Sequence, residues 1–106
     1  MHDGMYRYTI EMAVPLGRRA GTLTLAVEGG LVTGSLTLFE RSCPIWDGHL
    51  DGDRLRFCGE MQTLLYSLPY TADGTVSDRE LNLTFETQKG KFSAKGAAPK
   101  INGIKK

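Results

Sequence analysis

The sequence predicts an all-β fold, a single antiparallel up-and-down β-barrel of about eight strands. Two observations support this prediction. A hairpin phrase occurs twice, and apolar residues alternate with polar residues along most of the chain, whereas the three- and four-residue spacing of a helix is rare. Sequential hairpins without a long crossover favour a barrel over a Greek-key sandwich, and closure removes the sheet edges that invite aggregation.

The repeated phrase joins the end of one strand, a tight acidic turn and the start of the next strand. Its first copy runs from Asp47-Gly48-His49-Leu50 into Asp53-Arg54-Leu55-Arg56-Phe57. Its second copy runs from Asp73-Gly74-Thr75-Val76 into Asp78-Arg79-Glu80-Leu81-Asn82-Leu83. A repeated hairpin indicates an antiparallel meander, and a meander of this length tends to close into a barrel.

The chain begins with two alternating segments. Residues 6–14 alternate until residues 15–19 break the strand, and residues 22–27 alternate again. The sequence Glu28-Gly29-Gly30 predicts a tight hairpin, because glycine accepts positive φ freely. The first two strands and their turn are therefore expected in the first thirty or so residues.

The middle of the chain is regular on both sides of one irregular segment. Residues 34–38 alternate, whereas residues 40–46 do so less clearly. Pro44 belongs at a strand start or a bulge, because proline cannot donate a ladder hydrogen bond. After a turn at residues 51–53, residues 54–57 resume the alternation.

The last third predicts the remaining strands. Residues 61–63 indicate a connection or a bulge, and residues 64–70 are apolar on one face and partly on the other. Residues 70–76 continue as a strand that Gly74 bends. Further strands follow at residues 81–86 and 92–96, on either side of a turn at residues 88–90.

The alternation also predicts which side chains face the interior, because a one-residue slip would turn a whole strand inside out. The expected polar outer residues include Thr24, Thr37, Arg56 and Thr84. The expected inward residues are Tyr8, Ile10, Leu25, Leu36, Leu38, Leu55, Phe57, Leu81, Leu83, Phe85 and Phe92.

Length and charge limit the class of protein. At 106 residues the chain is expected to form one domain, residues 1–106, with a polar C-terminal tail at residues 96–106. The 13 basic and 12 acidic side chains are interspersed, which argues against a nucleic-acid partner. The sequence has no apolar run of roughly 18 residues, so no membrane span is expected. The first residues lack the basic and apolar regions of a signal peptide, so a cytoplasmic location is expected.

Cys43 and Cys58 are expected to be free thiols in a reducing compartment. If the turn at residues 51–52 joins their strands, Cys58 lies across from a position near Ile45. Cys43 is then displaced diagonally, which is poor geometry for a disulfide. No base beside either thiol marks a catalytic cysteine.

The hairpin phrase from Ile45 to Phe57 resembles the turn phrase of small calycin-like barrels, the broad group that includes lipocalins, fatty-acid-binding proteins and avidins. The resemblance is architectural and covers roughly residues 6–96. The chain departs from the lipocalins, because its first strand has no Gly-x-Trp and its single tryptophan is Trp46. It also lacks the avidin biotin-site pattern. The resemblance implies the barrel fold and no functional residue.

No segment carries a specific catalytic or metal-binding signature. Asp47, His49, Asp51 and Asp53 are the densest metal-capable cluster, but their spacing is not that of an EF-hand. Turn geometry explains their aspartates and glycines, so neither a metal nor a cofactor is expected. His49 with Ser42 or Cys43 makes no recognisable catalytic set, and we expect no catalytic residue.

Four tyrosines fall on the expected interior face, and each buried hydroxyl needs a partner. They are Tyr6, Tyr8, Tyr66 and Tyr70. One alternative is a partly polar cavity that holds a small ligand. The other is a filled core whose hydroxyls reach the barrel mouths. An eight-stranded barrel is wide enough for either.

The leading functional hypothesis is a non-catalytic barrel that binds a small, mainly apolar ligand entering at one rim. The expected mouth carries Trp46 and the irregular residues 42–47. The alternative is a protein-interaction or structural module with a filled core that acts as a homo-oligomer. The expected ligand-binding residues are Tyr6, Tyr8, Trp46, Arg56, Tyr66 and Tyr70.

Self-association is expected through residues 61–70. Leu65 and Pro69 fall on the face opposite Leu64, Tyr66 and Leu68, so the strand is apolar on both sides. The outer face of such a strand is commonly covered in an isologous dimer. We therefore predict a homodimer with Cys43 or Cys58 at its margin.

Overall fold

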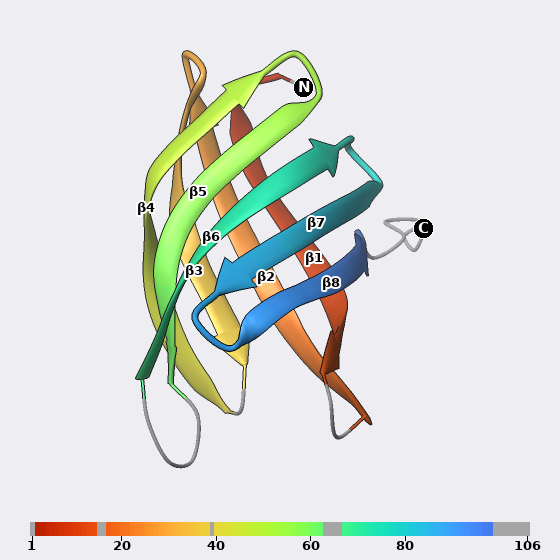
Figure 1. Cartoon of the computed structure of the whole chain (residues 1–106). Coiled ribbons are helices and arrows are strands. Elements are labelled where there is room, and N and C mark those ends of the chain that lie inside the picture. The colour runs from red at the N-terminus through yellow and green to blue at the C-terminus, as the bar shows by residue number, and fades with distance from the viewer. Residues whose placement is uncertain (1, 15–16, 39, 63–66, 99–106) are drawn as a thin grey trace.

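The chain folds into one closed, antiparallel β-barrel in which each strand pairs with the next and the last pairs with the first (Figure 1). This computed structural model describes residues 2–14, 17–38, 40–62 and 67–98. The predicted up-and-down barrel is confirmed. The strands are β1 (Gly4–Val14), β2 (Gly17–Glu28), β3 (Leu31–Leu38), β4 (Arg41–Asp51), β5 (Arg54–Gln62), β6 (Ser67–Val76), β7 (Glu80–Thr87) and β8 (Gly90–Ala97).

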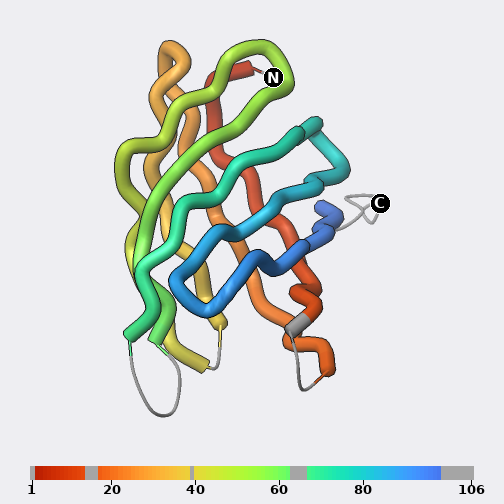
Figure 2. The backbone as a smooth tube through the Cα atoms, viewed as in Figure 1, coloured from red at the N-terminus to blue at the C-terminus, as the bar shows by residue number. Residues whose placement is uncertain are grey.

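The two ends of the barrel carry different connections, which can be followed along the backbone in Figure 2. We call the end with the turns at residues 29–30, 52–53 and 77–79 the upper end. The lower end carries the connections that follow β1, β3, β5 and β7. The molecule is flattened, with principal extents of 41 × 29 × 19 Å.

The predicted inward face is confirmed. All of the predicted inward side chains are buried except Phe92, which is partly buried and packs against the core. On the outer face, Arg56 and Thr84 are exposed, and Thr24 and Thr37 are half-buried. Alternation set by the pleat therefore places the core correctly on every strand tested.

Large and small residues alternate across the interior, so that the barrel is filled. One row runs through Leu25, Gly34, Ile45, Gly59 and Tyr70 on five successive strands. Leu25, Ile45 and Tyr70 are buried, and each aligns with a neighbour that has no side chain. This pattern lets layers of side chains interlock in a small barrel.

Gly74 has a packing role that the sequence analysis did not predict. It faces the interior, and a Cβ there would lie 1.9 Å from the carbonyl oxygen of Asn82. Strands β6 and β7 can approach this closely only because residue 74 has no side chain.

The repeated phrase forms two neighbouring hairpins at the upper end. The first joins β4 to β5 and the second joins β6 to β7, as predicted. The two turns contact each other, because the Val76 backbone N–H donates to the Asp53 carbonyl at 2.9 Å. Both phrase glycines, Gly48 and Gly74, sit where a Cβ would collide with a neighbouring strand.

The prediction that residues 40–46 are irregular is wrong. β4 pairs with β3 in unbroken register from Arg41 to Ile45. Pro44 is tolerated because β4 pairs with β5 only from Ile45 onward. The irregularity comes later, at a bulge where Asp47 has φ 55°.

Three predicted boundaries also shift. Residues 17–19 belong to β2, and residues 61–62 extend β5. β8 runs to Ala97, so residues 96–97 of the predicted tail are part of the strand. In each case pairing with a neighbouring strand extends an element beyond its alternating core.

Candidate functional site

The barrel interior contains one polar group that stands out. Tyr70 is 5% exposed, and its hydroxyl has no hydrogen-bond partner, the single such buried side-chain atom in the described residues. The hydroxyl lies over Gly59, where a Cβ would be 2.5 Å from the phenolic oxygen. Gly59 thus provides the space that the Tyr70 hydroxyl occupies.

Aromatic packing fixes the direction of the Tyr70 ring. Its centroid is 4.9 Å from that of Phe85 and 6.0 Å from that of Phe57. Phe57 and Phe85 also contact each other, with centroids 6.1 Å apart. Edge and tilted contacts of this kind hold rings in place, so the hydroxyl cannot easily turn to find a partner.

The environment of Tyr70 is strongly apolar. Burial raises the pKa of its hydroxyl well above the ordinary value, and the nearby thiols of Cys43 and Cys58 raise it further. The hydroxyl is therefore a neutral donor at physiological pH. A buried donor without an acceptor is costly, so the site favours any molecule that brings an acceptor to it.

Tyr6 and Tyr8 already have acceptors at the upper end. The Tyr8 hydroxyl donates to the Ser77 carbonyl at 2.6 Å, and the Tyr6 hydroxyl donates to the His2 carbonyl. Burial, with a smaller contribution from Asp78, raises the pKa of Tyr8 to about 12. These two hydroxyls tie the N-terminal segment and the β6–β7 turn to the barrel and have no donor left to offer.

Trp46 and Arg56 lie on the outer wall. Trp46 is 46% exposed, in the middle of β4 and opposite Cys58. Arg56 is exposed and in register with His49 and Asp73. The prediction that Trp46 marks a mouth is wrong, because β4 stays regular up to this residue and its pleat directs the side chain outward.

The expected ligand-binding residues therefore divide between three places. Tyr6 and Tyr8 lie at the upper end, Tyr70 in the lower half, and Trp46 and Arg56 outside. Tyr66 lies outside the described residues. The structure does not bring the expected set together, and Tyr70 alone combines an interior position with an unused hydrogen-bond donor.

The two cysteines are free and lie on opposite faces of the wall. Cys43 is in register with buried Leu36, on the inner face. Cys58 is opposite exposed Trp46, one residue from the expected position, and its sulfur lies 3.9 Å from the Thr71 hydroxyl. Thiols on opposite faces of the wall cannot form a disulfide, which is a stronger reason than the diagonal displacement expected from the sequence.

On sequence alone, Arg18 and Arg19 are assigned to a turn that breaks the strand, in preference to a site for an anionic partner, and Arg41 is given no role, but Arg19 and Arg41 both lie in strands at the lower end. Arg19 is in register with Met12, and Arg41 is in register with Leu38. Both partners are buried in the core, so both arginines stand on the inner face of the wall at the rim. The alternation in the sequence already indicated the inner face for Arg19, because it lies an even number of positions from Leu23 and Leu25.

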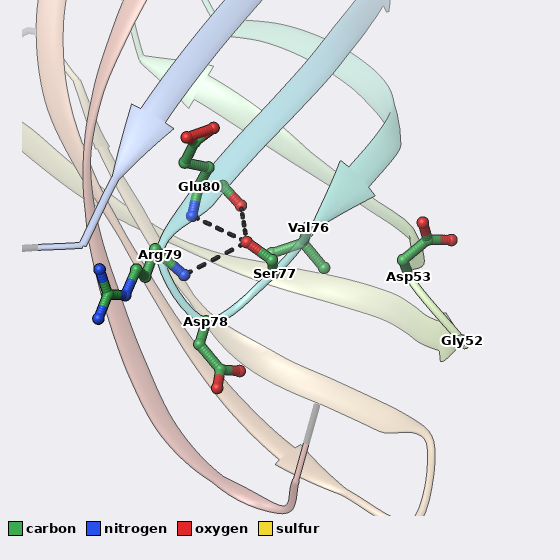
Figure 3. Close-up of a pocket in the computed structure, with 7 residues that line it drawn as sticks. All are labelled: Gly52, Asp53, Val76, Ser77, Asp78, Arg79 and Glu80. Carbon is green, nitrogen blue, oxygen red and sulfur yellow. Dashed lines mark hydrogen bonds between the residues drawn. The ribbon is translucent and has the colours of Figure 1, made fainter.

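A shallow groove lies between the β4–β5 and β6–β7 turns at the upper end (Figure 3). Its shape depends on Ser77, whose hydroxyl oxygen accepts from the backbone N–H groups of Arg79 and Glu80 at 3.3 and 3.1 Å. The groove is lined by the acidic residues Asp53, Asp78 and Glu80 together with Gly52, Val76, Ser77 and Arg79. In the described part of the chain, no three His, Cys, Asp or Glu side chains gather to hold a metal ion.

No protein-family model, curated protein or solved structure matches this chain. Across the ranges that the structure describes, no helix has the length and apolar character needed to cross a membrane. The site must therefore be interpreted from its own geometry.

Proposed function

We propose that this barrel binds a small, mainly apolar ligand that carries one hydrogen-bond acceptor, and that Tyr70 donates to that acceptor. The supporting observation is the buried Tyr70 hydroxyl that lacks a partner. A hydrogen bond stabilises most where the donor has no alternative partner, and the Tyr70 hydroxyl has none.

The ligand enters at the lower end. Strand pairing closes the wall, so only the connections between strands can open. The inner face of the lower half is apolar and surrounds the approach to Tyr70. It is formed by Leu38, Cys43, Met61, Leu68 and Phe92.

Binding requires the lower half to open locally, because Met61 and Leu68 are buried and in register just below Tyr70. Local opening of a barrel end costs much less than global unfolding. No general base lies in position to act on a bound molecule among the described residues, so binding without chemistry is proposed. We also propose that the protein is cytoplasmic and that its barrel is of the calycin type.

Fluorescence titration with a neutral naphthyl ketone dye tests the proposal. The dye is apolar and carries a single carbonyl acceptor. We expect saturable binding that Tyr70→Phe weakens by about five- to tenfold, the effect of one lost hydrogen bond. Tyr6→Phe is the matched control, because its hydroxyl already has an acceptor at the other end. Absence of saturable binding to the wild-type chain would refute the proposal.

A filled interaction module that forms a homo-oligomer is the second candidate. The outer wall of β2, β3 and β4 favours it, because its side chains between residues 22 and 26, 33 and 37, and 42 and 46 carry no charge. Trp46 is exposed on this wall, and Pro69 is exposed on β6. Leu64, Leu65 and Tyr66 of the predicted dimer segment lie outside the described residues.

Sedimentation equilibrium at high micromolar concentration tests this second candidate. A homodimer is expected for the wild-type chain, and Trp46→Lys or Pro69→Lys identifies the face that is used. Thr84→Lys, on the exposed wall of β7, is the control. If the wild-type chain is a monomer at all concentrations, the homo-oligomeric module is ruled out.

A further inference from the structure

The inner rim of the lower end carries two arginines on nearby strands. Arg19 on β2 and Arg41 on β4 are exposed, yet each is paired in register with a core residue. β3 lies between them and contributes Leu38, which packs against Gly21, two residues from Arg19. By register, the two arginines therefore stand on either side of Leu38 on the inner face of the rim.

Both cations are available to a ligand. Among the described residues, neither guanidinium forms an ion pair. Arg19 makes one long contact, 3.5 Å to the carbonyl oxygen of Arg18. Arg18, by contrast, is engaged with Glu11 at 2.9 Å on the outer face.

The charge of the two ends reinforces this local arrangement. Within the described connections and the three strand residues next to them, Arg18, Arg19, Arg41, Lys89 and Lys91 at the lower end outnumber Glu40, Glu60 and Glu86. By the same measure the upper end has the acidic residues Asp3, Glu28, Asp51, Asp53, Asp78 and Glu80, which outnumber Arg54, Arg56, Arg79 and Lys95. A separation of this kind attracts anions to one rim and repels them from the other.

The rim and the buried donor belong to the same part of the barrel. Cys43 is two residues from Arg41 on the same face of β4, and its thiol is among the groups that raise the pKa of Tyr70. Arg41, Leu38 and Cys43 thus share the inner face between the lower rim and Tyr70.

We propose that the ligand is an anionic amphiphile, with its negative head group at Arg19 and Arg41 and its apolar body against Leu38 and the lower core. This inference rests on the proposed ligand-binding function and adds the charge and orientation of the ligand. Arginine suits the role, because its planar group can bind a carboxylate or a similar anion with two parallel hydrogen bonds.

A matched pair of competitors tests the head-group charge. Decanoate and decanamide have the same chain and differ in charge, and each is titrated against the neutral naphthyl ketone dye bound to the full chain at low ionic strength. We expect decanoate to displace the dye at a concentration about fivefold lower, the size of effect that a solvent-exposed ion pair produces. Addition of about 1 M salt should remove the difference.

Two variants locate the effect. The double substitution Arg19→Gln and Arg41→Gln should abolish the preference for decanoate while dye binding remains. Arg56→Gln, on the outer wall, should leave the preference unchanged.

The outcomes separate the two proposals. Equal displacement by decanoate and decanamide, or a preference that survives the double substitution, overturns the anionic assignment while ligand binding stands. If the dye, decanoate and decanamide all fail to bind, the proposed function falls and this inference falls with it.

Discussion

At the scale of single residues, the three described tyrosines show how similar side chains can have different roles. Tyr6 and Tyr8 donate to backbone carbonyls, whereas Tyr70 has no acceptor. A hydroxyl that is buried without a partner loses its bonds to water and regains nothing on folding. Tyr70 therefore reduces stability in the free protein, and a role in binding would explain why the hydroxyl is there.

Tyr70→Phe should raise the free energy of unfolding by about 1 kcal/mol, because it removes an unsatisfied polar group and keeps the ring. Tyr8→Phe should lower it by about 1 kcal/mol, since the Ser77 carbonyl loses its donor. Urea denaturation of both variants measures the difference. A clear loss of stability in Tyr70→Phe would show that the hydroxyl has a partner in solution.

Alkaline pH should destabilise the barrel through the same side chains. Burial raises the pKa of Tyr8 to about 12 in the folded chain, against about 10 for an unfolded tyrosine. The folded state then holds its proton more tightly, so this stabilisation is complete below about pH 10 and is lost as the pH rises toward 12. The raised pKa of Tyr70 acts in the same direction.

Urea denaturation at several pH values between about 9 and 12 measures this loss. The decline should be shallower in Tyr8→Phe, which has one perturbed phenol fewer. Equal slopes in the variant and the wild-type chain would contradict the assignment to Tyr8.

At the scale of elements, individual strands depend on residues that break the regular pleat or leave space in it. Asp47 has φ 55° at the β4 bulge, a conformation that most side chains disfavour. The bulge sits where the register with β5 shifts between Trp46 and His49. It keeps Trp46 and His49 both on the outer wall although they are three positions apart.

Asp47→Val should lower the free energy of unfolding by about 1–2 kcal/mol, because a β-branched side chain fits the left-handed region poorly. Asp47→Gly should be tolerated, since glycine adopts positive φ freely. His49→Val, exposed on the same strand, is the control. Thermal or urea unfolding checks the order, and equal stability of Asp47→Val and His49→Val would contradict it.

Gly74→Ala tests the close approach of β6 and β7. A Cβ at this position would lie 1.9 Å from the Asn82 carbonyl oxygen, which is backbone and cannot turn away. We expect a loss of about 2 kcal/mol or more, in the range of overpacked cores. Thr75→Ala on the exposed side of β6 should change stability by less than about 0.5 kcal/mol, and similar losses in the two variants would show that the strands can separate freely.

At the scale of the whole molecule, closure is the weakest part of the sheet. β1 pairs with β2 at eleven positions but with β8 at only four. The seam also joins the first and last strands of the chain. The barrel should therefore open first between β1 and β8.

Native-state hydrogen exchange measures this difference. The amides of β8 that face β1 should exchange faster than those between β2 and β3, because opening the seam leaves the rest of the meander intact. Uniform protection around the barrel would show that all strand pairs open together.

Much of the fold could be predicted because the deciding information is local. Alternation with a period of two determines the face of each residue, and this placed Leu55, Phe57 and Phe85 in the core. The candidate site was harder to predict. Tyr70 was identified as an interior tyrosine, but Trp46 and Arg56 were grouped with it although they point outward.

The pattern of residues along the chain was sufficient to establish an eight-stranded meander, its turns and its inner face, since each depends on neighbours in sequence. Tertiary structure decided which tyrosine lacks an acceptor and that Arg19 and Arg41 flank Leu38. The physical reason is that these properties depend on the register between distant strands. Tyr8 reaches Ser77 only because the sheet closes on itself, whereas Tyr70 faces apolar neighbours and Gly59.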